Sequence, residues 1–172
     1  MWRRLLALAV LSSWAVAAHA AIQIERQMSS GGIPFLVLSG EFSSEDDVDE
    51  FSAVARSHKA LFVTFDSVGG NVASAIRYGR AIRTLGLHTV QTRSVNCMSA
   101  CALAFVGGVA RNAEAGAIGV HQHSFGIGGP SGRDDAVAVS QLLTADVIDY
   151  LKEMDVDTVR DQRLWHRIEG VI

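Results

Sequence analysis

Ser99 and His121 are the two side chains whose chemical types suit covalent catalysis. Ser99 lies in residues 96–101 (NCMSAC), among small or compact neighbours and just before an apolar, helix-forming stretch. A serine hydroxyl at such a turn can act as a nucleophile, while the next backbone N–H is directed at the substrate oxygen. The simpler interpretation of a serine in this position is a helix N-cap.

His121 ends a predicted strand over residues 117–121 (AIGVH). An imidazole can accept the proton of a serine near neutral pH and return it to a leaving group. Alternate residues of a strand share a face, so His123 is expected beside His121. Taken alone, the two histidines are equally consistent with an ordinary loop edge.

Gly69 and Gly70 follow a predicted strand and precede a predicted helix. Glycines at such a junction allow a sharp turn and let backbone N–H groups approach a ligand without an intervening side chain. N–H groups near a helix N-terminus favour negative charge. The alternative is a plain turn between strand and helix.

The elements that must position these residues alternate between short apolar strands and amphipathic helices. This pattern is typical of an α/β domain with a largely parallel sheet. Strands are expected at residues 33–38, 61–65, 88–92 and 117–121, and helices from a cap at Ser43 or Ser44, over 72–85, through 105, over 134–154 and, more weakly, over 157–168. The strand at 61–65 (LFVTF) is apolar enough to be covered on both faces. The glycine-rich residues 126–132 have the composition of a mobile loop.

Residues 66–83 (DSVGGNVASAIRYGRAIR), 96–108 (NCMSACALAFVGG) and 118–126 (IGVHQHSFG) together resemble the proteolytic subunit of the Clp protease and its relatives. That family has a Gly-Gly loop, a serine that opens a helix and a histidine at a strand end, in this order and at similar spacing. The resemblance covers about residues 61–151. It implies a ClpP/crotonase-like α/β fold, with a mainly parallel sheet built from repeated strand–helix units, and serine peptidase activity.

Carried onto this chain, the resemblance implies that Ser99 is the nucleophile and His121 the general base. The N–H groups of Gly70 and Ala100 would form the oxyanion hole. It implies no cofactor, a peptide or protein as substrate, and a possible homo-oligomer. The acid that orients the histidine in the family cannot be assigned: the candidates are Asp157, Asp161 and Glu169, or the site is a Ser–His dyad.

The N-terminal residues predict export. Arg3 and Arg4 precede an apolar run at 5–17, and residues 18–20 (AHA) resemble a cleavage site, so residues 1–20 are expected to be a signal peptide. The run is too short to span a membrane. Residues 21–172 would then form a single periplasmic domain without a membrane span. Without ATP there, no ATP-driven unfoldase is expected, and substrates would be short or unfolded peptides.

Composition argues against nucleic acid as a partner, because the formal net charge is −3 and aromatic residues make up 7%. Cys97 and Cys101 flank Ser99 and could pair in an oxidising compartment. Three alternatives remain open. The two cysteines with His121 and His123 could bind zinc, although their spacing matches no common module. The domain could be an inactive oligomerising or peptide-binding module, or it could carry out acyl-CoA chemistry on the related crotonase fold.

Overall fold

The computed structural model describes residues 21–121 and 133–156. The strands in these residues are β1 (Gln23–Met28), β2 (Pro34–Phe42), β3 (Phe62–Gly70), β4 (His88–Gln91) and β5 (Arg111–Ala113). The helices are α1 (Val48–His58), α2 (Val72–Thr84), α3 (Cys101–Val106) and α4 (Arg133–Glu153). The expected signal peptide, the glycine-rich loop, His123 and the three acid candidates lie outside the described residues.

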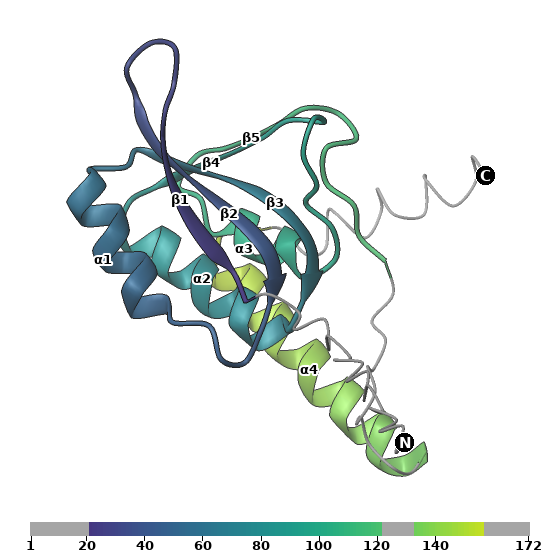
Figure 1. Ribbon diagram of the computed structural model, residues 1–172. Helices are drawn as coiled ribbons and strands as arrows, with labels where there is room; N and C mark the ends of the chain where they lie inside the picture. The colour runs from purple at the N-terminus through teal and green to yellow at the C-terminus, as the bar shows by residue number, and fades with distance from the viewer. Residues whose placement is uncertain (1–20, 122–132, 157–172) are drawn as a thin grey trace, which may run out of the picture.

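The strands form one sheet in the order β1-β2-β3-β4-β5, and they are parallel except where β1 pairs with β2 (Figure 1). The expected α/β domain with a mainly parallel sheet is confirmed. β1 was not predicted, because five of its six residues are exposed and no apolar alternation marks it. β5 was also missed, since its three residues are too few for a periodic signal.

One face of the sheet carries the core. Leu36, Leu38, Val63 and Phe65 are fully buried there, against residues of α1, α2 and α3. The opposite face was expected to be covered as well, but this is wrong for the described residues: Phe62 and Thr64 are only half-buried. Phe62 instead stacks on Phe35 of β2, with 4.6 Å between ring centroids. The apolar run of β3 therefore reflects ring stacking on this side, rather than a second helical layer.

α1 begins one turn later than predicted. Its N-cap is Asp47, whose carboxylate accepts the N–H groups of Asp49 and Glu50, so the predicted cap at Ser43 or Ser44 is wrong. The neighbouring Asp46 has turned inward. Its carboxylate accepts the N–H of Ile22 at 3.1 Å, the N–H of Ser43 at 2.8 Å and the hydroxyl of Ser74 at 2.7 Å. Asp46 thus ties the start of the described chain to α2.

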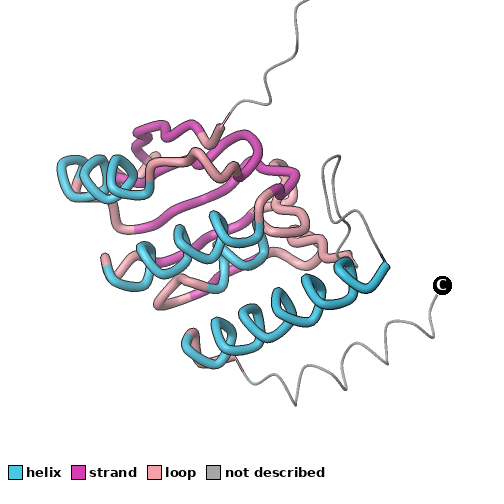
Figure 2. Tube along the Cα trace, turned by 90° about the horizontal axis from the view of Figure 1, so that it is seen from below, coloured by secondary structure: helices cyan, strands magenta, loops and turns pink. Residues whose placement is uncertain are grey.

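α2 confirms the predicted helix over 72–85 to within a residue, and α4 confirms the one over 134–154. α4 lies beyond the layer formed by α2 and α3 (Figure 2). Tyr150 attaches it there: its hydroxyl donates to the carbonyl of Leu103 at 2.8 Å, over the backbone of Gly79. A side chain at Gly79 would overlap that hydroxyl, so the glycine is needed for α4 to approach α2 this closely. None of the described helices is long and apolar enough to cross a bilayer.

β3 continues past the predicted strand end at Phe65 as far as Gly70. Its extension pairs with the serine segment through a parallel bridge between Ser67 and Cys97. A second parallel bridge joins Met98 to Gly119. The predicted strand at 117–121 is reduced to that single bridge. Three segments distant in sequence therefore lie side by side, with the serine segment in the middle.

Candidate active site

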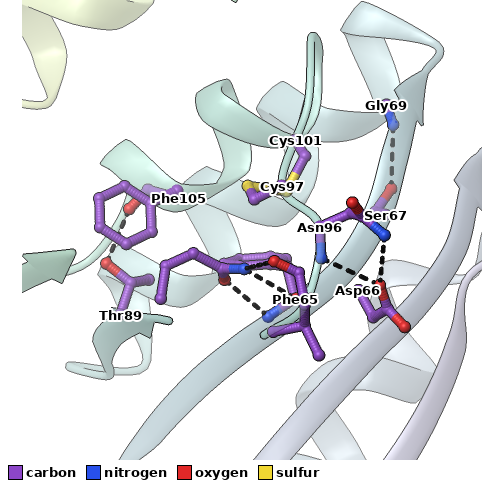
Figure 3. The surroundings of a disulfide bond; sticks show 11 residues. Phe65, Asp66, Ser67, Gly69, Thr89, Asn96, Cys97, Cys101 and Phe105 are labelled. Atoms are coloured by element: carbon purple, nitrogen blue, oxygen red, sulfur yellow. Dashed lines mark hydrogen bonds between the residues drawn. A yellow bond between two sulfur atoms is a disulfide. The ribbon is translucent and has the colours of Figure 1, made fainter. Parts of the chain in front are cut away.

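The segment before Ser99 is fixed to the extension of β3. Ser67 donates its N–H to the carbonyl of Asn96 at 2.8 Å and accepts the N–H of Met98 at 3.0 Å. The carboxylate of Asp66 accepts both the backbone and the side-chain N–H of Asn96, at 3.0 and 3.2 Å (Figure 3). These bonds set the position at which the chain enters the turn at Ser99.

Ser99 occupies a left-handed backbone conformation, with φ +56°. Non-glycine residues seldom adopt this region, and strain of this kind is concentrated at functional sites. α3 begins only at Cys101, and Ala100 is its N-cap, so Ser99 does not cap the helix. The turn is closed by two backbone bonds around it, from Cys101 N–H to Met98 O at 3.1 Å and from Ala102 N–H to Ser99 O at 3.0 Å.

Gly69 packs directly against this turn. A Cβ at Gly69 would lie 2.7 Å from the Cβ of Ser99, 2.8 Å from the carbonyl oxygen of Met98 and 3.1 Å from the nitrogen of Ala100. No side chain fits in that space. Gly69 also has φ +108°, a conformation that favours glycine. The glycine is therefore required for β3 to approach Ser99 this closely.

His121 is brought toward Ser99 by the backbone. The N–H of Ser99 donates to the carbonyl of Gly119 at 2.7 Å, and the N–H of Gly119 donates to the carbonyl of Cys97 at 2.9 Å. These two bonds fix the register between the serine segment and the histidine segment. His121 follows Gly119 by two residues and, like Ser99, lines the cavity described next.

Ser99, Ala100 and His121 line one cavity of about 460 Å³. Its other wall comes from α4, and the lining there is mostly apolar, with Leu143, Val147 and Ile148 beside Ser140 and Thr144. Leu143 and Val147 are four residues apart, as on one side of a helix, but nothing in the sequence places them opposite Ser99. Only the packing of α4 beneath α3 makes them part of this cavity.

Two polar groups of the serine turn, the hydroxyl of Ser99 and the N–H of Ala100, have no hydrogen-bond partner in the described residues. Ser99 is half-buried, and its hydroxyl makes no hydrogen bond with any residue in 21–121 or 133–156, His121 included. Within the same residues, the N–H of Ala100 donates no hydrogen bond. Catalytic hydrogen bonds are often long or open in the absence of substrate. The arrangement can thus present a nucleophile and one amide donor side by side.

Gly70 faces β2, whereas Gly69 faces the turn at Ser99. A Cβ at Gly70 would meet the backbone of Phe42 and the side chain of Glu41 in β2, and Gly70 is not among the residues that line the cavity in the described chain. The N–H of Gly69 donates to the hydroxyl of Ser67 at 3.2 Å. The role of Gly70 as an oxyanion donor stays a prediction.

Cys97 and Cys101 lie at disulfide distance, with 2.01 Å between their sulfur atoms (Figure 3). Sulfur atoms joined in this way are not thiolate ligands, so the zinc set predicted from the sequence would retain only its imidazoles. The described residues contain no group of three or more potential metal ligands. Of the four predicted ligands, His123 lies outside the described residues.

Comparison with known proteins adds little to this geometry. No protein-family model matches the chain, and no curated protein matches it. Among solved structures, a protein named as an enoyl-CoA hydratase from Streptomyces coelicolor A3(2) matches 64% of this chain and 52% of its own, at 12% identity and a TM-score of 0.32. The chain thus spans about half the length of that protein, and a likeness this weak assigns neither family nor activity. What is established is a mainly parallel α/β domain whose serine, histidine and apolar helix wall share one cavity.

Proposed function

We propose that this protein is a serine hydrolase, with Ser99 as nucleophile and His121 as general base, that cleaves short or unfolded peptides without ATP. The supporting observation is the backbone register between Ser99 and Gly119, which directs the hydroxyl and the imidazole to one cavity. The resemblance to Clp peptidases, seen in three ordered motifs, supports the same assignment. The acid member of a triad is left open among Asp157, Asp161 and Glu169.

In the proposed reaction, a rotation of the side chains brings the hydroxyl of Ser99 to His121. The imidazole takes the hydroxyl proton while the oxygen attacks the substrate carbonyl. The proton is then delivered to the leaving amine, and the C–N bond breaks to leave an ester on Ser99. Water, deprotonated by His121, hydrolyses that ester and restores the free serine.

The negative oxygen of the tetrahedral intermediate requires hydrogen-bond donors. Ala100 supplies one, because this residue lines the cavity and its N–H donates no hydrogen bond within the described residues. We assign the second to Gly70, because the neighbouring amides of Gly69 and Asn71 already donate to Ser67 and Phe42. Loss of one such donor typically costs about 3 kcal/mol of transition-state stabilisation.

The wall formed by α4 supports an apolar group on the substrate next to the scissile bond. Burial of a leucine-sized side chain contributes about 1.5–3 kcal/mol, which is enough to select among peptides. For location, we propose export to the periplasm, on the basis of the charged and apolar pattern in residues 1–20. Fractionation of cells that produce the full chain, against a chain beginning at Ala21, tests that part separately.

An active-site serine probe tests the hydrolase. We expect a fluorophosphonate to label the wild-type protein and not Ser99→Ala. His121→Ala should slow labelling by about 10²–10⁴-fold, the usual contribution of a general base. Ser94→Ala is the matched control, because this exposed serine is paired with Thr92 outside the cavity.

Two results would contradict the proposal: a folded wild-type protein that is never labelled, or Ser99→Ala labelled as fast as wild type. The first outcome would favour the inactive binding module. Circular dichroism and thermal unfolding of each variant establish that a loss of labelling is not a loss of fold.

A further inference from the structure

The disulfide-distance pair encloses the candidate nucleophile. Cys97 belongs to the segment that pairs with β3, Cys101 is the first residue of α3, and Ser99 lies midway between them. Figure 3 shows the bridge between that segment and the helix. Both cysteines are 0% exposed. The bridge is thus a buried link across the one turn that carries Ser99.

The start of α3 lacks a side-chain cap in the described residues. The helix has six residues, fewer than an isolated helix needs for stability, and its N-cap Ala100 offers no side-chain hydrogen bond. A serine hydroxyl commonly fulfils that role, but it would then be occupied by a backbone N–H. Here the hydroxyl of Ser99 remains outside the cap, in a left-handed turn that the surroundings must hold.

We propose that the Cys97–Cys101 bridge is a positioning element for Ser99, which replaces the side-chain cap of α3 and leaves the hydroxyl for the substrate. It fixes the first residue of the helix to the strand-like segment, so that the turn between them keeps its shape. The effect on the Ser99 backbone does not depend on the proposed hydrolase function. The effect on catalysis rests on the proposed hydrolase function.

Burial also decides between a permanent clamp and a redox switch. Reduction by a small dithiol requires its thiolate to reach one sulfur, after which the second thiol of the reductant closes to a cyclic disulfide and two protein thiols are released. In the folded protein neither cysteine is accessible to that attack. We therefore expect dithiothreitol to leave the bridge intact until the protein is unfolded, with thiol release measured by alkylation and mass.

The double variant Cys97→Ala/Cys101→Ala tests the clamp with two readouts. The first is amide hydrogen exchange at Ala102, whose N–H donates to Ser99 O at 3.0 Å. It should accelerate at least about tenfold as this turn opens locally, while β3 stays protected. The second is inactivation by a fluorophosphonate. The maximal rate of inactivation at saturating probe should fall about 100-fold, because the reacting hydroxyl is misplaced. The probe concentration that gives half of this maximal rate should stay unchanged, because the α4 wall is intact.

Ile82→Ala is the control for lost stability, because Ile82 is fully buried in α2 and does not line the cavity. It should lower the unfolding temperature but leave both readouts as in wild type, measured below its transition. If the double variant does not fold, adding Ser99→Gly removes the left-handed strain and should restore folding. Failure of glycine to do so would overturn the clamp.

The outcomes separate the two proposals. Unchanged exchange at Ala102 in the double variant overturns the clamp, whatever the labelling. Accelerated exchange with an unchanged inactivation rate overturns its catalytic part. Accelerated exchange in a protein whose wild type is never labelled supports the clamp and contradicts the hydrolase.

Discussion

Ser99 and Gly119 are joined backbone to backbone, with the N–H of the serine donating to the glycine carbonyl at 2.7 Å. This bond holds the histidine segment in one register against the turn at Ser99. A shift of one residue along either segment would send the alternate side chain to the cavity. The pairing of the candidate nucleophile with His121 therefore depends on main-chain geometry, before any contact between the two side chains.

Gly69→Ala should disable the site and destabilise the fold. The new methyl group would lie 2.7 Å from the Cβ of Ser99, and the backbone has φ +108°. We expect a loss of about 1–3 kcal/mol from strain alone and a fall of about 100-fold in labelling from displacement of Ser99. Denaturant unfolding and probe kinetics measure the two effects.

Gly86→Ala is the matched control for that variant. Gly86 also has positive φ, at +70°, but a Cβ there would meet nothing within 4 Å. The free energy of unfolding of this variant should fall by about 1 kcal/mol, and the fluorophosphonate should label it as fast as it labels the wild type. Equal labelling of the Gly69 and Gly86 variants would show that contact with Gly69 does not position Ser99.

Leu143→Trp should narrow the cavity. Leu143 lines it from α4, whereas the adjacent Leu142 is 68% exposed and does not line it. With p-nitrophenyl esters as surrogate substrates, kcat/KM for an octanoyl chain should fall about tenfold or more, while the acetyl ester is little affected. Leu142→Trp, which adds the same side chain outside the cavity, should leave both esters unchanged. An equal fall of kcat/KM in both variants would show that the substrate does not bind in this cavity.

Both tyrosines of the chain should resist ionisation until the protein unfolds. Tyr78 and Tyr150 are 1% and 0% exposed, and burial raises the pKa of each well above the usual 10.0. Nearby carboxylates add to the increase, Asp46 at Tyr78 and Glu153 at Tyr150. Above pH 10 the unfolded chain releases phenol protons that the folded chain keeps, so stability should fall as pH rises.

The expected slope is about 1.4 kcal/mol per pH unit for each tyrosine, and Tyr150→Phe should remove one of the two contributions. At neutral pH, the free energy of unfolding of the same variant should be about 1 kcal/mol lower than that of the wild type, because the hydrogen bond to Leu103 is lost. Absorbance at 295 nm and unfolding at stepped pH measure both. A phenolate signal from the folded protein near pH 10 would be inconsistent with this burial.

Asp46→Asn should destabilise the domain more than Asp47→Asn, although the two residues are adjacent. The buried carboxylate of Asp46 accepts three hydrogen bonds, and an amide nitrogen in its place would face a donor. We expect a loss of about 1–3 kcal/mol. Asp47 caps α1, where asparagine is an equally good cap, so its change should be small. Chemical denaturation compares them directly.

The elements with strong periodicity could be predicted because the signal is local. The alternation of strands and helices, the helix over 72–85 and the long helix ending near Met154 all follow from side-chain spacing along one segment. β1 and β5 could not be predicted, because one is polar and the other has three residues. Their strand state comes from hydrogen bonds to a neighbouring strand, which no local pattern records.

The candidate site also combines features that the sequence predicts with features that arise only in the folded structure. Residue type and spacing alone determined Ser99 and His121 as candidates, the glycine pair beside a strand end, and two cysteines close enough to join across one turn. Tertiary structure decided that Gly69 is the glycine against the serine, that Asp46 turns inward to Ile22 and Ser74, and that α4 forms a wall of the cavity. The physical reason is range: spacing and propensity act within a turn or two, whereas register and cavity walls arise only when distant segments pack together.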